Sequence, residues 1–478
     1  MLTAKCRITR HIKAITVTGF SVLFAHPLLA APNDAHHGAY EAGASDAQNV
    51  YFYEQGDQQY LYSMWGVVPI VVDEKAEFKA VNPELGLSGH FCHLDSGEYQ
   101  SGKLNYNSFS MTFGRIKNLP EEDRIATLFD DAFWDSISSS QTCPRNDWKR
   151  ATKVAFDRSL IKGLIEASQQ QGSKYSDTNS LLIAKDGKLV VEEYFNGWQP
   201  EFPHMIQSIT KSLTSLALGA AIQDELISGS EAKMAELMPN YSTLLKGDKA
   251  QLSMHHFLTM SAGLDWDEWN IPYEDPNNVR QQEIASINPI DFILDRELIS
   301  KPGEQFRYNG GLVTIVGQVV ADKSGHDNLS GVIREESLSK LCLQSAYLMK
   351  QNGEVSNAAG GAYLRPKDML KIGQLVAQKG QWNGEQIVSP QWIDQSVKGY
   401  VSTGVGAHSY GYYWWTSDAY VDGTVYPITY GLGYGGQVVA IVDELNLVVA
   451  RTANHFSGPT PNHEMMKEYI IPAFLSAN

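Results

Sequence analysis

The sequence lacks several features that large classes of protein require. Basic residues are in the minority, 38 against 54 acidic ones, and the net charge of −16 argues against nucleic-acid binding, which depends on clustered Lys and Arg. There is neither a His-Glu-x-x-His pattern nor paired Cys-x-x-Cys, so we expect no metal and no cofactor. A content of 43% apolar and 19% charged residues excludes intrinsic disorder for most of the chain.

The first thirty residues have the pattern of a secretory signal peptide. Four basic residues within positions 5–13 precede an uncharged, mostly apolar run at 14–25, and small residues then offer cleavage after Ala30 or Ala31. The run is shorter than the ~20 residues of a spanning helix, which favours a leader over a membrane anchor. We therefore expect residues 1–30 to be removed, no membrane span afterwards, and a periplasmic or secreted protein.

Cysteine is scarce, and its placement leaves few pairings. Cys6 belongs to the leader, which leaves Cys92, Cys143 and Cys342. In an exported protein one disulfide is expected. We predict the pair Cys92–Cys143, because both residues lie in the N-terminal third of the chain. Cys342 lies in an apolar, helix-like stretch, which favours a buried free thiol.

Two regions of different character follow the leader. Runs rich in Tyr, Val and Ile between residues 50 and 115 predict strands, so residues 31–150 are assigned to a β-rich N-terminal region of unknown role. Residues 151–478 form the second region. A hairpin is expected at 180–195 and further strands at 438–450, and they bracket a long, largely helical middle. This pattern indicates the α/β (α+β) fold class.

The most informative stretch is an apolar helix pattern that carries Ser-x-x-Lys near its start. Residues 205–222 are apolar on nearly all sides, which predicts a buried helix. Ser208 shares a face with Lys211, and a lysine whose pKa is lowered by burial can take the proton of a serine nucleophile. By itself the pattern is unspecific, because it recurs on helix faces that we expect to be solvated, at 159–162, 230–233 and 337–340.

Two later segments supply groups that such a serine needs. Tyr308 precedes a glycine pair that opens an apolar helix, and a tyrosine near a lysine either relays a proton to a leaving group or simply packs. The run 431–437 holds four glycines and leads into a strand, so its backbone can approach a ligand closely. A peptide N–H there would complete an oxyanion hole with that of Ser208, whereas the alternative is a β-bulge without a catalytic role.

In this order, the three segments resemble the motifs of the serine beta-lactamase and penicillin-binding superfamily. The branch is the one that holds class C beta-lactamases, D-alanyl-D-alanine carboxypeptidases, family VIII esterases and 6-aminohexanoate-dimer hydrolases. The linking segments resemble the same branch at residues 177–180, 256–266, 302–304, 364–369, 382–392 and 410–415. The resemblance covers about residues 175–475 and leaves the N-terminal region out.

This resemblance implies an antiparallel sheet flanked by helices, with a helical subdomain inserted between its strands. The active site would lie between the sheet and the subdomain. The resemblance also implies that Ser208 is the acylated nucleophile, Lys211 its base, and Tyr308 the tyrosine that shuttles protons with the lysine. In the third motif, Gly433 and Tyr434 fall at the oxyanion hole, where Tyr434 would lend its backbone N–H beside that of Ser208.

Two positions depart from the family's motifs. The second motif usually carries Asn two residues after the tyrosine, where this chain has Asn309 directly after Tyr308 and then Gly310. The third motif usually carries Lys or His where Gly431 stands, and that cation helps to hold the carboxylate of a beta-lactam or a D-Ala-D-Ala peptide. We assign Asn309 and Gly431 to the substrate-binding positions and expect substrates without that carboxylate.

We therefore predict an exported serine hydrolase that cleaves a small-molecule ester or amide through an acyl-enzyme on Ser208. Two alternatives stay open: a beta-lactamase or D-Ala-D-Ala carboxypeptidase-like cell-wall enzyme, and a non-catalytic ligand-binding relative. Five aromatic residues either line an acyl pocket or pack in the core, namely Trp266, Trp269, Tyr412, Trp414 and Trp415.

Overall fold

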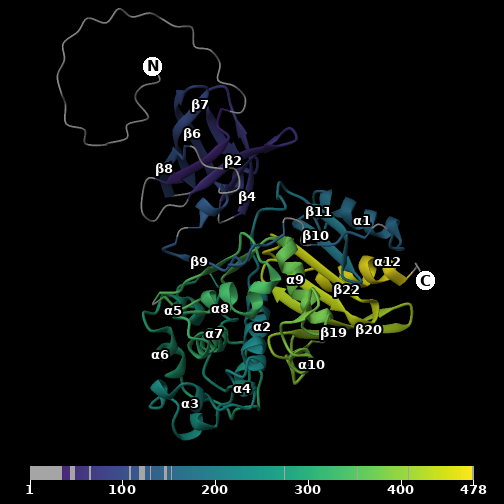
Figure 1. The fold of residues 1–478 in the computed structure, drawn as a ribbon. Helices are drawn as coiled ribbons and strands as arrows, with labels where there is room; N and C mark the ends of the chain where they lie inside the picture. Colours follow the sequence, from purple (N-terminus) through teal and green to yellow (C-terminus); the bar gives the residue numbers. More distant parts are fainter. Residues whose placement is uncertain are drawn as a thin grey trace, which may run out of the picture. The chain divides into compact units, whose positions relative to one another are not determined.

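The computed structural model describes residues 35–475 with the exception of 43–48, 64–65, 107–108, 118–123, 130, 145–147, 152, 274, 353 and 407. The chain divides into two compact units, one up to residue 130 and one from residue 131 (Figure 1). The leader pattern of residues 1–30 lies outside the described residues. None of the helices within them has the length and apolar character that crossing a membrane requires.

The first unit is a closed barrel of antiparallel strands. β1 pairs with both β2 and β8, which closes the sheet. Aromatic rings fill its interior, and Tyr40, Phe52, Phe78, Phe91 and Phe113 make edge-on contacts there. The strands predicted for residues 50–115 are confirmed. They are β2 (Val50–Gln55), β3 (Gln58–Ser63), β4 (Gly66–Val72), β5 (Glu77–Ala80), β6 (Leu87–Asp95), β7 (Glu98–Tyr106) and β8 (Phe109–Arg115). β1 (Gly38–Ala42) lies before this range and is not among the predicted strands.

The second unit is built on an antiparallel sheet with the order β11-β10-β22-β21-β20-β19-β18-β17. The hairpin predicted at 180–195 is β10-β11, and the strands predicted at 438–450 are β21 and β22. Strands from the two ends of the unit therefore lie side by side at β10 and β22. The sheet consists of β10 (Thr178–Lys185), β11 (Lys188–Tyr194), β17 (Val401–Ser402), β18 (Ser409–Tyr410), β19 (Trp415–Val421), β20 (Thr424–Gly433), β21 (Gln437–Val442) and β22 (Leu447–Ala453).

Helices cover this sheet, and a helical subdomain is inserted between its strands. α9 packs across β10, β21 and β22, while α2 packs against β20 and β21. In the subdomain, α7 is the central helix and contacts α2, α4, α5, α6 and α8. The predicted fold is thereby confirmed. The helices named in the text are α1 (Arg158–Gln169), α2 (Ile209–Gln223), α4 (Met254–Leu258), α5 (Val279–Ala285), α6 (Pro289–Leu294), α7 (Gly310–Ser324), α8 (Leu329–Glu335) and α9 (Pro366–Ala377).

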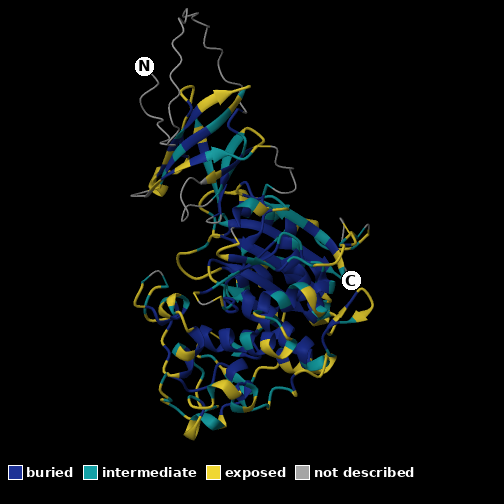
Figure 2. Cartoon of the chain, turned by 60° about the vertical axis from the view of Figure 1, so that its left-hand side comes forward, coloured by how far each residue is buried: buried dark blue, intermediate teal, exposed yellow. Residues whose placement is uncertain are grey.

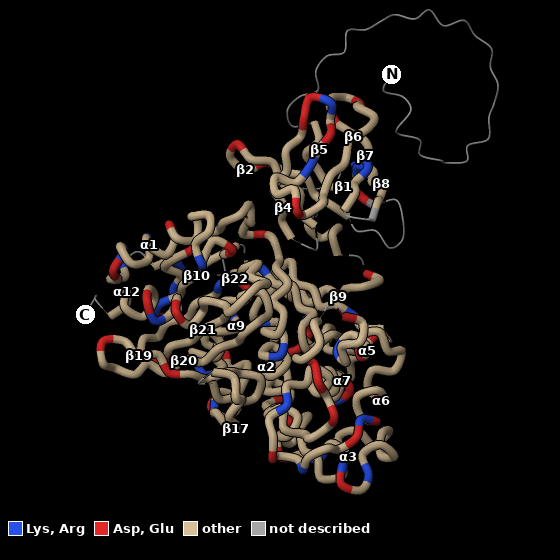
Figure 3. Tube along the Cα trace, turned by 180° about the vertical axis from the view of Figure 1, so that it is seen from behind, with Lys and Arg blue, Asp and Glu red and all other residues tan. Residues whose placement is uncertain are grey.

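The two apolar helices predicted from the sequence lie at the centre of this unit. α2 is buried continuously from Ile209 to Ala221, and α7 from Gly310 to Gly317. Buried residues, dark blue in Figure 2, fill the interior of this unit, including the middle of its sheet. Lys, Arg, Asp and Glu are scattered along the chain as short blue and red segments of a mostly tan tube (Figure 3). Polar side chains on α2 are therefore enclosed by protein.

A small second sheet leads the chain into α2. Its order is β12 (His204–Met205), β14 (Ala362–Leu364), β13 (Tyr347–Met349) and β9 (Trp134–Ser136). β12 pairs with β14, and the hydrogen bond from Ile206 N to Ala362 O continues this pairing by one residue. The turn before α2 thus starts from a fixed strand.

The cysteine pairing differs from the prediction. Cys143 is bonded to Cys342, with 5.5 Å between their Cα atoms, so the predicted Cys92–Cys143 pair and the predicted free thiol at Cys342 are both wrong. Cys342 ends a 3₁₀ turn in the left-handed conformation, at φ 53°. Cys92 lies on β6 of the barrel, whereas Cys143 belongs to a segment of the second unit.

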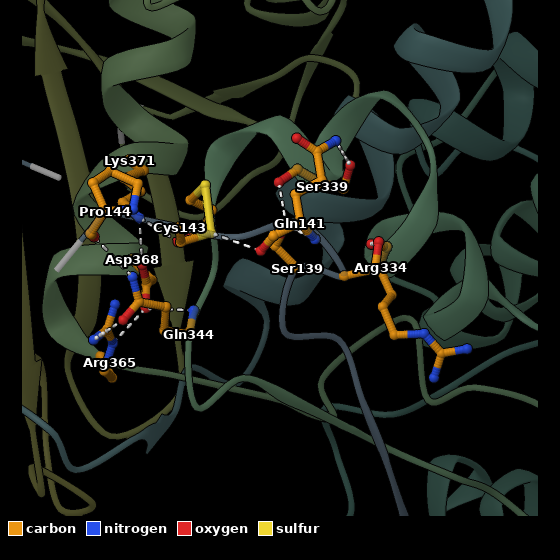
Figure 4. Close-up of a disulfide and its surroundings, with 12 residues drawn as sticks. Ser139, Gln141, Cys143, Pro144, Arg334, Ser339, Gln344, Arg365, Asp368 and Lys371 are labelled. Carbon is orange, nitrogen blue, oxygen red and sulfur yellow. Dashed lines mark hydrogen bonds and ion pairs between the residues drawn. A yellow bond between two sulfur atoms is a disulfide. The ribbon is translucent and has the colours of Figure 1, made fainter. Parts of the chain in front are cut away.

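The segment that carries Cys143 runs along the second unit (Figure 4). Ser139 donates from its backbone N–H to Leu343 O and from its Oγ to Ser339 O, at 2.9 and 2.7 Å. Gln141 donates to Ser339 Oγ at 2.9 Å. These bonds bring together two cysteines that are 199 positions apart, a proximity that their spacing in the sequence does not reveal.

Candidate active site

Ser208 lies at the start of α2, in the turn that follows β12. Gln207 adopts the left-handed conformation at φ 53°, so the chain reverses sharply before the helix begins. Hydrogen bonds from Ile209 N to Ile206 O and from Thr210 Oγ1 to Gln207 O, at 3.2 and 2.7 Å, fix this turn. A non-glycine residue held at positive φ costs energy and is typical of functional sites. The turn holds Ser208 at the positive end of the helix dipole.

Lys211 lies one helical turn after Ser208, and its amine faces the serine hydroxyl. The distance from Lys211 Nζ to Ser208 Oγ is 3.0 Å, and Nζ also donates to Ala359 O at 2.6 Å. Burial lowers the pKa of Lys211 to about 7; the Glu268 carboxylate acts in the opposite direction, and the Arg280 cation lowers the pKa further. A substantial fraction of this amine is therefore neutral near pH 7, and a neutral amine can accept the serine proton.

Tyr308 completes a cluster with these two residues. Lys211 Nζ lies 4.8 Å from the centroid of the Tyr308 ring, and Tyr308 is buried. Burial and the nearby Glu268 carboxylate raise the pKa of Tyr308 well above its usual range, which outweighs the lowering that the Ser208 side chain exerts. The phenol therefore stays protonated and acts as a donor. The ring of Trp269 stacks on it at 4.9 Å between centroids.

Asn309 has a defined structural role. It is the N-cap of α7, and its Oδ1 accepts a hydrogen bond from Leu312 N at 3.2 Å. Its backbone N–H donates to Met260 Sδ at 3.4 Å. The side chain is almost wholly buried. This capping contact fixes the start of α7 directly after Tyr308, and the substrate contact assigned to Asn309 stays a prediction.

Glu268 is a buried carboxylate beside this cluster that the motifs do not indicate. Its Oε2 accepts hydrogen bonds from Trp266 Nε1 at 2.6 Å and from Gly310 N at 2.7 Å, and its Oε1 accepts one from the Tyr273 hydroxyl at 3.0 Å. The bond to Gly310 N places the negative charge at the positive end of α7. The one signal in the sequence is a pair of acidic residues between two tryptophans, at 266–269.

The glycine-rich strand lies directly against the turn that carries Ser208. A Cβ at Gly433 would be 2.4 Å from Ile206 O, so only glycine allows this approach of the two backbones. Tyr434 follows at the end of β20. The turn after it is held by Gln437, which donates to Gly435 O, and by the buried Arg451, which donates to Gly436 O; both distances are 3.2 Å. The backbone at Gly433 and Tyr434 is thus fixed beside the serine.

The position of the missing third-motif cation faces α2. A Cβ at Gly431 would lie 3.3 Å from Ser212 Oγ and 3.5 Å from the Trp414 ring. Trp414 is fully buried, and it therefore fills the space next to Gly431 with an apolar ring. With glycine at 431, this position itself provides no cation, and the one polar atom among its nearest neighbours, Ser212 Oγ, donates to Tyr413 O at 2.8 Å.

Four of the five aromatic residues belong to the core, namely Trp266, Tyr412, Trp414 and Trp415. Trp415 and the exposed Trp269 stack on Tyr308, at 6.0 and 4.9 Å between ring centroids. Trp269 is 47% exposed and Tyr434 is 43% exposed, so two aromatic rings border solvent, one stacked on Tyr308 and one directly after Gly433. We call these two residues the aromatic rim.

Comparisons with known proteins agree with this architecture. The Beta-lactamase family model matches residues 167–469. The 6-aminohexanoate-dimer hydrolase of Paenarthrobacter ureafaciens is 21% identical over 239 residues, which amount to 46% of this chain. The match spans 57% of that relative's length, so it leaves a large part of the curated relative unmatched.

Solved structures share the fold of the second unit. A Bacillus anthracis protein assigned as a 6-aminohexanoate-dimer hydrolase has a TM-score of 0.56 and 18% identity, over 72% of this chain and 90% of that chain. A family VIII carboxylesterase has a TM-score of 0.54 and 14% identity, over 68% of this chain and 98% of its own. At these identities the likeness concerns the fold alone. The superfamily that the motifs resemble is confirmed.

Proposed function

The chain belongs to the Beta-lactamase family, and from this premise we propose that it is an exported serine hydrolase that cleaves an ester or amide through an acyl-enzyme on Ser208. One observation carries the proposal: the Lys211 amine lies 3.0 Å from Ser208 Oγ in a buried setting that lowers its pKa to about 7. A surface lysine at the same spacing would be fully protonated at neutral pH and could not accept the serine proton.

In the acylation step, neutral Lys211 takes the Ser208 proton while Oγ attacks the carbonyl carbon. The backbone N–H groups of Ser208 and Tyr434 receive the oxyanion, a contribution that is typically worth about 3–4 kcal/mol per donor. Tyr308, which is protonated at the start of the step, donates its proton to the leaving oxygen or nitrogen as the carbonyl–leaving-group bond breaks. The proton on Lys211 then returns to Tyr308. The acyl group is left on Ser208.

Deacylation uses Lys211 and Ser208 again, with water as the nucleophile. A water molecule gives a proton to neutral Lys211 and adds to the acyl carbon. The carbonyl–Oγ bond then breaks, and Ser208 takes the proton back from Lys211. The carboxylic acid product leaves, and all three residues return to their starting protonation states. Every proton is carried by a residue that the structure places in this cluster.

The environment of Gly431 supports substrates without a carboxylate. Trp414 borders that position with an apolar ring, and the aromatic rim lies next to Tyr308 and Gly433. We propose a neutral small-molecule ester or amide with an apolar group, because aromatic walls favour such groups over anions. The carboxylate of a beta-lactam or D-Ala-D-Ala substrate would lack the ion pair that a third-motif cation supplies.

Two observations support export. The leader pattern of residues 1–30 is that of a signal peptide, and Cys143 is bonded to Cys342. Disulfides persist in the periplasm and outside the cell, whereas cytosolic thiols are kept reduced. We propose a periplasmic or secreted location, which fractionation of cells that express the full chain would test directly.

A substrate panel tests the proposed function. We expect the protein to hydrolyse p-nitrophenyl butyrate or a matched anilide and to leave a chromogenic beta-lactam intact. Ser208→Ala should abolish turnover, while Ser159→Ala, in the exposed Ser-x-x-Lys of α1, should leave it unchanged. Rapid beta-lactam turnover would favour the cell-wall enzyme. No turnover of any member, with tight binding retained in Ser208→Ala, would favour a binding protein.

A further inference from the structure

The space beside Gly310 is filled by an arginine from another part of the chain. Gly310 stands where the motif leads one to expect an asparagine, two residues after Tyr308. A Cβ at Gly310 would lie 2.9 Å from both Cδ and Nε of Arg280. Arg280 belongs to α5 and is almost wholly buried. Any side chain at position 310 would therefore have to displace the Arg280 guanidinium.

The guanidinium is held by partners that are themselves buried. Arg280 forms an ion pair with Glu283 on the same helix and donates a hydrogen bond to Asn357 Oδ1. Glu283 Oε1 in turn accepts hydrogen bonds from Thr314 Oγ1 at 2.8 Å and from Gln351 Nε2 at 3.1 Å. A buried charge pair with this many satisfied contacts has a single favourable arrangement.

Asn357 connects this arrangement to Lys211. Asn357 opens a turn that Gly361 closes, with 2.9 Å between Gly361 N and Asn357 O. Ala359, inside the turn, provides the carbonyl that accepts from Lys211 Nζ at 2.6 Å. The preceding carbonyl, of Ala358, accepts from Thr214 Oγ1 on α2 at 2.9 Å. The turn 357–361 therefore fixes the direction of the Lys211 amine from outside its own helix.

We propose that Arg280, lodged in the space that Gly310 leaves open, is a positioning residue for Lys211, because it anchors through Asn357 the turn whose Ala359 carbonyl orients the lysine. This proposal rests on the function proposed above for Ser208. It also gives the departure at Gly310 a physical reason. An asparagine side chain has no room at position 310, because the Arg280 side chain from α5 occupies that space.

Arg280 also contributes to the charge that Lys211 experiences. Two charged side chains from different elements act on Lys211: Glu268 raises its pKa and Arg280 lowers it. The other two neighbours, Ser208 and Tyr308, are neutral groups near pH 7. Removing the Arg280 cation should therefore raise the pKa of Lys211, and the neutral amine should form only at higher pH.

The test measures how fast a fluorophosphonate labels Ser208, as a function of pH, in the full chain. Arg280→Ala is combined with Glu283→Gln so that no unpaired charge remains buried. The pH at which labelling reaches half its maximum should rise by about one unit, which slows labelling roughly tenfold below that pH. The matched control is Arg334→Ala/Glu335→Gln, which removes an exposed ion pair. It should change neither the midpoint pH nor the rate of labelling.

A second variant separates positioning from general destabilisation. Gly310→Asn should slow labelling by roughly tenfold to a hundredfold, because the guanidinium must move and the 357–361 turn with it. In the Arg280→Ala/Glu283→Gln background, the same Gly310→Asn change should add almost no further loss, since the space is then empty. Thermal unfolding of each variant shows that the protein compared is folded.

Four results decide between the possibilities. A raised midpoint together with coupling between positions 280 and 310 supports the proposal. Folded variants that label at the wild-type rate with an unmoved midpoint overturn it, and so do equal losses from Gly310→Asn in both backgrounds. A wild-type protein that is not labelled at Ser208 at all overturns the proposed function instead, which keeps the two failures distinct.

Discussion

At the scale of the residue, the chemistry depends on the state of one buried amine. Lys211 is enclosed by α2, by the turn 357–361 and by the Tyr308 ring, and its pKa is lowered to about 7 chiefly by burial. Spacing in the sequence predicts that Ser208 and Lys211 share a helix face. It does not indicate which charges face the lysine, because Glu268 and Arg280 come from segments without a motif.

The lowered pKa of Lys211 gives a testable pH dependence. Only the neutral amine accepts the serine proton, so kcat/KM for ester hydrolysis should fall as the pH drops through about 7 and level off above it. Measuring kcat/KM for p-nitrophenyl butyrate from acidic to alkaline pH gives the pH at which kcat/KM falls to half its maximum. A half-maximal pH near the ordinary pKa of an exposed lysine would contradict the role assigned to Lys211.

A single methyl group at Gly433 should disable the oxyanion hole. Its Cβ would lie 2.4 Å from Ile206 O, so Gly433→Ala must push β20 away from the turn before Ser208. We expect kcat to fall roughly a hundredfold, the loss seen when one oxyanion donor is removed. Gly163→Ala on α1, where the new Cβ would make an ordinary 3.7 Å contact with Tyr469, is the control and should keep full kcat. Equal activity of both variants would refute the placement of the third motif.

At the scale of the element, the strongest patterns in the sequence are confirmed. The uniformly apolar runs become the buried helices α2 and α7, and the Asp-Gly hairpin becomes β10-β11. What the sequence does not reveal is contact between segments far apart in the chain. Cys143 lies beside Cys342 because the segment that carries Cys143 runs along the surface of the same unit. Arg280 lies beside Gly310 because α5 packs against α7.

The Cys143–Cys342 bond should stabilise the second unit. It joins positions 199 residues apart, and removing a disulfide that closes a long loop typically costs about 2–5 kcal/mol of unfolding free energy. Cys143→Ser/Cys342→Ser should therefore unfold at a lower denaturant concentration than the wild type. Peptide mapping without reductant should also recover these two cysteines in one linked peptide. A linked peptide that joins Cys143 to Cys92 would contradict the structure.

At the scale of the whole molecule, the two units differ in what they contribute. Every residue placed in the site, from Ser208 to Arg451, belongs to the unit that begins at residue 131. The barrel has its own aromatic core and separate strand pairing. The sequence predicts its strands, whereas the closure of the sheet into a barrel depends on the pairing of β1 with β8, and the role of the unit has no motif in the sequence.

This division predicts that the barrel can be removed without loss of the chemistry. A chain that starts at Asp131 should be labelled by a fluorophosphonate at the rate of the full chain, because none of the contacts described around Ser208 comes from the first unit. Thermal unfolding of both proteins provides the control for folding. A folded short chain that labels much more slowly would show that the barrel takes part in the site.

The central claim is that Ser208 is an activated nucleophile, and one measurement tests it most directly. The protein is exposed to a fluorophosphonate, its intact mass is recorded, and peptide mapping locates the modified residue. We expect a single adduct on Ser208 in the wild type and in Ser159→Ala, and none in Ser208→Ala or Lys211→Met. No adduct on the folded wild-type protein, or an adduct that persists in Ser208→Ala, would contradict it.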